Sequence, residues 1–368
     1  MPNNTKNTGS GQPRITVHQI AEAAGVSIGT VSNVINGSPT VREKLRHRVL
    51  SAIRSLGYQP NQLSRGLRLN RTNIIGMIVP DITNPFFPSV VRGAEDIAYE
   101  SSHRLILCNT DNDPQKEASY LNDLQSFLPA GLLIIPAVDS TVSSKDNGVP
   151  TVCLDRLPDG WKGDFVVVAN YQGAYDAAKH ILRMGHRQIA VICGPFHLTN
   201  ARERLEGFRS ALREARISMA PEYIQQGRFD RASGYTAAIR LLRLVPRPTA
   251  IFVANDLMAL GALTAVRECK LTCPEDVSIV SFDGLDITEF SDPALTAVYQ
   301  PGYQLGQAAA RLLLKRIGGW TGPPQKVVMA TELKVRNSVA SIPLRKSDGK
   351  LASRAETRGE GRRRTLRA

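Results

Sequence analysis

Apolar residues recur every three or four positions in three short segments near the start of the chain, and this spacing predicts amphipathic α-helices. The segments span residues 17–24, 28–35 and 42–56. Thr16 and Gln19 have the spacing of a capping box before the first segment. Gly25 follows at a turn position, and Ser27 can cap the second segment. Two short helices joined by a glycine-containing turn and braced by a third predict a helix-turn-helix.

From residue 73 to about residue 340, short apolar runs rich in β-branched residues alternate with amphipathic segments. This alternation is typical of parallel sheets covered by helices on both faces. The stretch is too long for one ordinary sheet, so we predict an α/β core of two doubly wound parallel-sheet subdomains. Strands are expected at residues 74–79, 105–109, 131–135, 151–154, 166–168, 188–193, 250–254, 278–282 and 295–299. Helices are expected at residues 87–101, 174–184, 201–215, 233–244 and 258–269.

The formal charge of +13 is concentrated at the two ends of the chain. Residues 1–71 carry ten Lys and Arg and two acids, and residues 344–368 carry nine and three. Basic segments attract polyphosphates because each neutralised phosphate releases counterions. The N-terminal charge therefore favours a DNA-binding helix-turn-helix over a small three-helix domain with no nucleic-acid role. The C-terminal tail is poor in large apolar residues and is predicted to be disordered, either as a solvated tail or as an auxiliary DNA contact.

Composition and motifs exclude several classes of protein. No apolar run approaches the roughly 20 residues of a membrane-spanning helix. The polar N-terminus lacks the pattern of a secretory signal, so we expect a cytoplasmic protein. The sequence contains no G-x-G-x-x-G after a strand, no P-loop, no G-x-S-x-G and no H-E-x-x-H. We therefore expect neither an enzyme nor a bound cofactor, and the cysteine spacing does not predict a metal site.

The order of these motifs resembles a known family. Residues 15–68, ITVHQIAEAAGVSIGTVSNVINGSPTVREKLRHRVLSAIRSLGYQPNQLSRGLR, resemble the DNA-binding head of the LacI/GalR bacterial transcription regulators, and the resemblance continues to about Ala340. It implies a small all-α head and a periplasmic-binding-protein-like core with a ligand in its cleft. The implied divisions are a disordered N-terminus (1–13), a DNA-binding domain (14–59), a hinge helix or linker (60–72), an effector-binding and dimerisation core (73–342) and a disordered basic tail (343–368).

The resemblance also assigns candidate DNA contacts. Phosphate and groove contacts match Thr16, Ser27, Thr30, Ser32 and Asn36. Base-reading positions match Ile28, Gly29 and Asn33. Asn33 stands where the family usually has arginine, so an amide suited to adenine replaces a bidentate guanine contact. Arg42 stands where the family usually has a serine that caps the third helix.

Residues 58–72 resemble the family's hinge helix, which folds only on DNA. Leu67 holds the place of a leucine that wedges into a minor-groove step, and the other matching contacts are Tyr58, Asn61 and Ser64. Gly66 and the shortness of the segment predict a poor isolated helix, since about 12–15 residues are needed in water. A wedge is favourable only when the bent duplex recovers contacts elsewhere. The alternative is a flexible linker whose Leu67 packs on the core.

Polar residues follow several predicted strands, where doubly wound folds bind their ligands. By the resemblance, effector-cleft positions match Phe86, Asn170, Arg204, Asn255, Asp283 and Gln300. Carboxylates, amides and a guanidinium around an apolar platform suit a sugar or sugar derivative, because each buried hydroxyl needs a partner. Ala169 and Gly284 stand where the family commonly has acids. Each polar residue could instead cap a helix or be solvated at a sheet end, and we expect Asp256 to cap the helix that begins near Leu257.

These features together predict a homodimeric repressor that binds a pseudo-palindromic double-stranded operator and is associated with the nucleoid when bound. A small-molecule effector would control operator affinity, and both an inducer and a corepressor are compatible with the sequence. Residues 344–368 lack leucine heptads, which favours a dimer over a tetramer. A sugar-binding transport receptor is disfavoured by the basic N-terminal segment and the absence of a signal, and a doubly wound enzyme by the absence of a catalytic motif.

Overall fold

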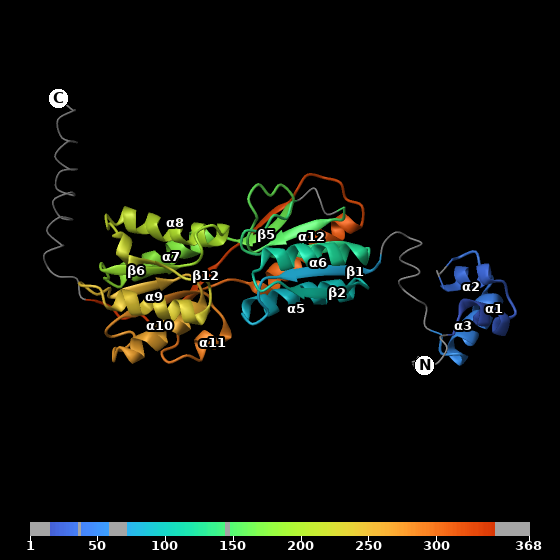
Figure 1. Cartoon of the computed structure of the whole chain (residues 1–368), viewed down its shortest axis with the longest axis horizontal. Helices are drawn as coiled ribbons and strands as arrows, with labels where there is room; N and C mark the ends of the chain where they lie inside the picture. Colours follow the sequence, from blue (N-terminus) through green and yellow to red (C-terminus); the bar gives the residue numbers. More distant parts are fainter. Residues whose placement is uncertain (1–14, 36–37, 59–71, 144–147, 343–368) are drawn as a thin grey trace, which may run out of the picture. The chain divides into compact units, whose positions relative to one another are not determined.

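The computed structural model describes residues 15–35, 38–58, 72–143 and 148–342. The chain divides into two compact units, one ending at Thr72 and one beginning at Asn73, which we call the head and the core. The expected disordered ends, and the expected hinge apart from Thr72, lie outside the described residues. None of the described helices has the length and apolarity that a bilayer span requires. Figure 1 shows the elements of both units.

The head consists of three helices, in agreement with the sequence pattern. They are α1 (Val17–Ala24), α2 (Ile28–Ile35) and α3 (Glu43–Ser55). The predicted capping box forms between Thr16 and Gln19, and Gly25 ends α1 in a left-handed conformation with φ of 59°. All three helices contribute to one apolar cluster, formed by Ile20, Ala21, Ala24, Val31, Val34, Val49 and Ala52. This shared cluster fixes α2 against its neighbours and leaves its other face in solvent.

Lobe 1 of the core is a six-stranded sheet in which every pairing is parallel. In spatial order its strands are β11 (Lys326–Met329), β5 (Asp164–Val168), β4 (Thr151–Leu154), β3 (Gly131–Ile134), β1 (Ile74–Val79) and β2 (Arg104–Asn109). Side chains along β1 alternate between two covered faces. Met77 packs on the face of α5 (Phe86–Glu100) and α12 (Gly302–Ile317), and Ile78 packs towards α6 (Pro114–Ser126).

Lobe 2 is a second six-stranded sheet, parallel except for one edge strand. In spatial order its strands are β12 (Glu332–Lys334), β10 (Thr296–Tyr299), β9 (Ser278–Asp283), β8 (Ala250–Val253), β6 (Ile189–Cys193) and β7 (Ile224–Gln226). The helices on one face are α7 (Asn170–Arg183) and α8 (Thr199–Glu214), and those on the other are α9 (Arg231–Leu242) and α10 (Asp256–Glu268). The short elements η1 (Pro221–Tyr223) and α11 (Asp286–Glu289) complete it.

The chain crosses between the lobes three times, after β5, after β10 and after β11. The prediction of two doubly wound parallel-sheet subdomains is therefore confirmed, although neither lobe is a continuous piece of sequence. Because the crossings leave from strand ends, residues that follow strands of both sheets reach the same region between the lobes (Figure 1).

Several elements have no counterpart among the predicted segments. The strands β7, β11 and β12 are only three or four residues long and partly exposed, so their sequence signal is weak. Helix α6 buries only Glu117 and Leu124, which leaves a weak apolar stripe. Helix α12 is strongly amphipathic, and its pattern was readable in the sequence.

Candidate functional site

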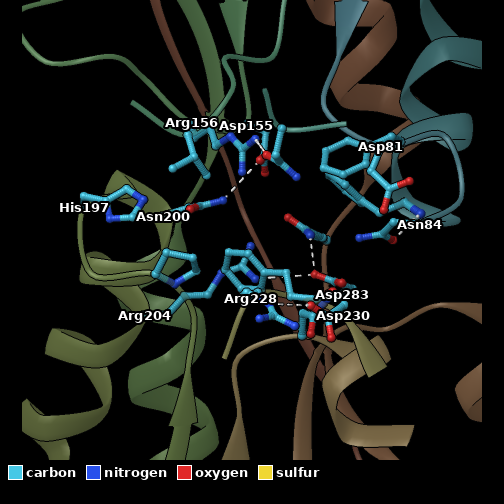
Figure 2. Close-up of a pocket in the computed structure, with 18 of the residues that line it drawn as sticks. Asp81, Asn84, Asp155, Arg156, His197, Asn200, Arg204, Arg228, Asp230 and Asp283 are labelled. Atoms are coloured by element: carbon cyan, nitrogen blue, oxygen red, sulfur yellow. Dashed lines mark hydrogen bonds and ion pairs between the residues drawn. The ribbon is translucent and has the colours of Figure 1, made fainter. Parts of the chain in front are cut away.

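A cavity of about 590 Å³ lies where the strand ends of the two lobes meet. Figure 2 shows side chains converging on it, with Asp81 and Asn84 from the segment after β1 and Arg204 and Asn200 from α8. The lining is Asp81, Asn84, Phe86, Phe87, Asp111, Asn112, Val138, Asp155, Arg156, Pro195, His197, Asn200, Arg204, Gln226, Arg228, Phe229, Asp230, Asn255, Asp283 and Gln300. We call this cavity the cleft. Its volume lies in the range typical of small-molecule sites.

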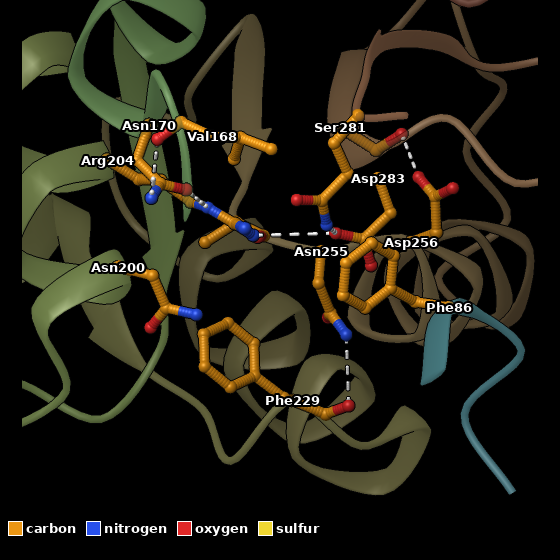
Figure 3. A network of polar contacts seen from close by, with 12 residues as sticks. Phe86, Val168, Asn170, Asn200, Arg204, Phe229, Asn255, Asp256, Ser281 and Asp283 are labelled. Carbon is orange, nitrogen blue, oxygen red and sulfur yellow. Dashed lines mark hydrogen bonds and ion pairs between the residues drawn. The ribbon is translucent and has the colours of Figure 1, made fainter. Parts of the chain in front are cut away.

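Arg204 is the central charged group of the cleft and is only 2% exposed. Its Nε donates to Oδ1 of Asn170 (2.9 Å), and its Nη1 donates to the carbonyl oxygen of Ala254 (2.7 Å). Nη1 also lies 3.5 Å from Oδ1 of Asp283. The guanidinium carbon lies 3.7 Å from the centroid of the Phe282 ring, which gives a cation–π contact. As Figure 3 shows, Arg204 thus joins the start of α7 to the end of β9.

Asp283 ends β9 with an unusual backbone, since its φ is 109°. Gln300 Nε2 donates to Asp283 Oδ1 at 2.6 Å. Burial raises the pKa of Asp283 well above its usual value; nearby Arg204 opposes this shift, and the Asp256 and Asp155 carboxylates add to it. Gly284 follows in the left-handed region, and a Cβ there would lie 2.7 Å from Cα of Tyr299. The left-handed backbone and this close approach both favour glycine at this position in this chain.

Lobe 1 contributes a second acid–arginine pair directly after β4. Asp155 has φ of 62° and accepts a hydrogen bond at Oδ2 from Asn200 Nδ2 (3.1 Å). Burial raises the pKa of Asp155, and nearby Arg204 and Arg156 oppose this shift. Arg156 Nε donates to the carbonyl oxygen of Pro136, and Nη2 donates to Asn112 Oδ1, both at 2.6 Å. Asp155 and Asn200 therefore link the two lobes across the cleft.

Of the six residues predicted for the effector cleft, the structure places five on its wall. Asn170 is the exception, because it lies behind Arg204, where its Nδ2 donates to Glu203 Oε2 (3.2 Å). The expectation for Asp256 was wrong. Asn255 caps α10 by accepting from the Met258 amide (3.0 Å). Asp256 is instead fully buried and accepts hydrogen bonds within lobe 2 from the Ser281 hydroxyl, the Leu285 amide and the Thr288 hydroxyl.

Several residues of the cleft wall were not predicted from the sequence. Asp155 and Arg156 directly follow the predicted strand 151–154, so the rule used for the other strand ends could have found them. Asn200 and Phe229 carry no comparable signal, because the fold alone brings them to the cleft. Phe229 and Phe86 supply apolar ring surface, and Gln300 Oε1 is buried without a hydrogen-bond partner among the residues that the structure describes. This free acceptor is the kind of group that a ligand hydroxyl or amine satisfies.

The head places most of its predicted DNA contacts on or beside α2. Ile28, Gly29 and Asn33 are exposed there, and Ile28 remains 44% exposed despite its apolar side chain. The half-buried ones are Thr30, Ser32 and Tyr58. Thr16 and Ser27 accept amide hydrogen bonds, from Gln19 (3.4 Å) and Thr30 (3.2 Å). Asn36, Asn61, Ser64 and Leu67 lie outside the described residues.

Arg42 precedes α3 and makes no side-chain cap hydrogen bond, as expected from the loss of serine at this position. An exposed cation therefore stands at this helix start. Two further arginines on α3 hold the turns of the head. Arg48 Nη2 donates to the Gly25 carbonyl (3.2 Å), and Arg46 Nη2 donates to the Ser38 carbonyl (2.8 Å).

The sequence matches two family models. Residues 16–61 match the model of bacterial regulatory proteins of the lacI family, and residues 178–339 match the periplasmic binding protein-like domain. The HTH-type transcriptional repressor PurR of Haemophilus influenzae (strain PittEE) is 37% identical over 335 residues, which cover 89% of this chain and 99% of that protein. The chain belongs to the LacI family. PurR of Histophilus somni (strain 2336) is 35% identical over 332 residues, covering 89% of this chain and 99% of that protein.

Solved structures agree with this membership. The Lac repressor dimer bound to operator and the anti-inducer ONPF has a TM-score of 0.79 and 26% identity, covering 89% of this LacI-family chain and 100% of that chain. A complex of the transcriptional regulator CelR with cellobiose has a TM-score of 0.67 and 33% identity, covering 88% and 100%. This LacI-family protein is a DNA-binding transcriptional regulator, and its relatives are regulators rather than enzymes.

Proposed function

We propose that this LacI-family regulator is a homodimeric repressor of a pseudo-palindromic operator, controlled by a neutral carbohydrate bound in the cleft. The observation that carries the proposal is a polar cleft, built around buried Arg204, in the same chain as a helix-turn-helix head. The PurR relatives are named repressors, and the Lac repressor was solved as an operator-bound dimer. An effector can change operator affinity only through different binding free energies to two states of the protein.

The exposed residues of α2 support the proposal that this helix enters the major groove and contacts base edges. Ile28, Gly29 and Asn33 are exposed on it, and an exposed amide such as that of Asn33 pairs with adenine through two hydrogen bonds. We assign the phosphate and groove contacts to Thr16, Ser27, Thr30, Ser32, Asn36 and Tyr58, and the hinge contacts to Asn61, Ser64 and Leu67 within residues 60–72. We place the protein in the cytoplasm, and on the nucleoid when it is bound to DNA.

The charge of the cleft favours an uncharged ligand. Its lining carries five aspartates and three arginines, so acidic side chains outnumber arginines. The cleft therefore has no excess of arginines to attract an anionic effector, such as a sugar acid or a sugar phosphate. The free Gln300 Oε1 and the Asp283 carboxylate offer acceptors to hydroxyl donors, and Phe86 and Phe229 offer ring surface to the apolar face of a sugar. The CelR–cellobiose complex shows a sugar bound to a 33% identical regulator.

Two measurements test the proposal. A gel-shift assay over a salt series with genomic fragments should give a sequence-dependent shift that weakens linearly in log affinity against log salt. A transport receptor or an enzyme should give no such shift. A thermal-shift screen of sugars, nucleosides and sugar acids should then find stabilisation by neutral sugars, and the same sugars should change the gel shift. Stabilisation by nucleosides or sugar acids alone would contradict the assigned ligand class while leaving the DNA-binding function intact.

A further inference from the structure

The exposed face of α2 carries no charged side chain. The helix has the sequence IGTVSNVI and contains no Lys, Arg, Asp or Glu. Val31 and Val34 are buried in the apolar cluster of the head. Ile28, Gly29 and Asn33 are exposed outside that cluster, and Gly29 and Asn33 are four residues apart, so they share a face of the helix. Bases that meet this face find an apolar side chain, an amide and a stretch of bare backbone.

Ile28 is the apolar side chain of α2 that does not pack into the head. The other apolar residues of this helix belong to the cluster, whereas Ile28 lies outside it and is 44% exposed. Gly29 beside it has no side chain, and a Cβ there would meet only Ser27 Oγ at 3.8 Å, so the space next to Ile28 is open. The apolar group that a base pair presents in the major groove is the 5-methyl of thymine. The exposed isoleucine therefore matches a thymine.

Asn33 supplies an amide that the head itself does not use. Within the described part of the head, this amide has no hydrogen-bond partner. The backbone of Asn33 is held, because its carbonyl oxygen accepts from the Ser38 amide (2.9 Å). The Thr30 hydroxyl, by contrast, already shares a hydrogen bond with Ser27 Oγ (3.0 Å). An amide pairs with adenine, whereas guanine is read by Arg or Lys and cytosine by Glu or Asp, which are the residue types that α2 lacks.

We propose that α2 reads A·T base pairs, with Ile28 on a thymine methyl and Asn33 on an adenine, so that the operator has A·T pairs where it faces this helix. The two side chains contact different base pairs. A helix rises about 1.5 Å per residue, so the five steps from Ile28 to Asn33 span about 7.5 Å. Stacked bases are about 3.4 Å apart, so the two A·T pairs lie roughly two steps apart. This inference rests on the proposed operator-binding function.

The first experiment selects duplexes from a randomised DNA library with the full-length protein. It is run with and without a bacterial small-molecule extract, because operator affinity is proposed to depend on an effector. The enriched half-sites should share A·T pairs at two positions about two steps apart. Replacing either pair by G·C in one half-site should lower affinity about tenfold or more. Asn33→Ala should remove the discrimination at one of these positions and keep it at the other.

The second experiment removes single groups from the selected operator. Deoxyuridine in place of thymidine removes only the 5-methyl group, and at one position of a half-site it should weaken wild-type binding about three- to fivefold, the effect of one buried methyl. Ile28→Ala should bind the thymine and uracil duplexes equally. Leu50→Ala is the matched control, because Leu50 is 42% exposed on α3 rather than on α2, and it should keep the thymine preference. Random-DNA affinity within about twofold of wild type would show that the Ile28→Ala head is folded.

The adenine contact is tested in the same way. Replacing adenine by 7-deazaadenine removes only the N7 acceptor and should weaken wild-type binding about fivefold, the effect of one hydrogen bond. Asn33→Ala should bind both duplexes equally. Asn33→Arg should change the selected base from adenine to guanine, because arginine pairs with guanine O6 and N7.

The outcomes separate this inference from the operator-binding function. Two A·T positions, one sensitive to Ile28 and the other to Asn33, would support the reading of A·T pairs by α2. G·C pairs at the position that depends on Asn33, or equal binding of thymine and uracil duplexes at every position, would overturn it while sequence-specific binding stands. Retention of adenine by Asn33→Arg would also count against it. If no sequence is enriched with or without the extract, the operator-binding function and the inference both fail.

Discussion

The buried Arg204–Asp283 pair should be essential for the stability of the core as well as for the effector response. In Arg204→Met, methionine keeps apolar contact with Phe282 but leaves Asp283 and the Ala254 carbonyl without their cationic partner. Removing one member of a buried pair costs about 3–5 kcal/mol. A typical domain has only about 5–15 kcal/mol of stability. The variant should therefore fold but unfold at markedly lower urea concentration.

Tryptophan fluorescence during urea unfolding measures this loss in the core alone, since Trp161 and Trp320 both lie there. The matched control is Arg213→Met on the same helix, whose side chain is 60% exposed and pairs with Glu206. The control should change stability by less than about 0.5 kcal/mol.

The double variant of Arg204→Met with Asp283→Asn should recover about 1 kcal/mol or more relative to the sum of the single variants, because the uncompensated carboxylate is gone. Arg204→Met should also abolish the effector response while operator binding without effector stays nearly unchanged. A loss below about 1 kcal/mol for Arg204→Met, or strict additivity, would refute the view of Arg204 and Asp283 as a coupled buried pair.

Three further predictions concern other parts of the chain. A Cβ at Gly29 would meet only Ser27 Oγ at 3.8 Å, so Gly29→Ala should stabilise the head by about 0.5–1 kcal/mol in thermal unfolding. The same variant should lower operator affinity in gel shifts, and unchanged affinity would remove Gly29 from the base-reading surface. Burial raises the pKa of Asp256 from 3.8 to about 6, so the folded protein binds a proton there at a higher pH than the unfolded chain does. As the pH falls from about 6.5 to 4.5, the wild type should therefore gain stability relative to Asp256→Asn, by at most about 1.4 kcal/mol per unit of pKa difference. Parallel pH profiles of the two proteins would show that Asp256 does not titrate in this range. Leu67→Ala should weaken operator binding much more than random-DNA binding, and an equal loss on both would discard the minor-groove wedge.

The sequence by itself determined the helix-turn-helix and the class of the core. Both depend on local patterns: the spacing of Ile20, Ala21 and Ala24 along one face of α1, the capping box at Thr16, and apolar runs such as residues 74–79. These patterns reflect helix and strand geometry, so they can be read without knowing what lies opposite. For the same reason, the expectation that ligands bind beyond the ends of strands placed Asp283 and Gln300 correctly on the cleft wall.

Only the tertiary structure decided how these residues combine. Arg204 meets Asn170 and Asp283 because α8, α7 and β9 converge, although the three residues are far apart in the sequence. The sequence also could not show that Asn255 rather than Asp256 caps α10, since adjacent polar residues at a helix start look alike until burial separates them. Glu117 accepts the Ala137 amide, and Asp164 binds Arg316, although each pair is far apart in the sequence. Such contacts depend on sheet order and on the three crossings between the lobes, which no local pattern encodes.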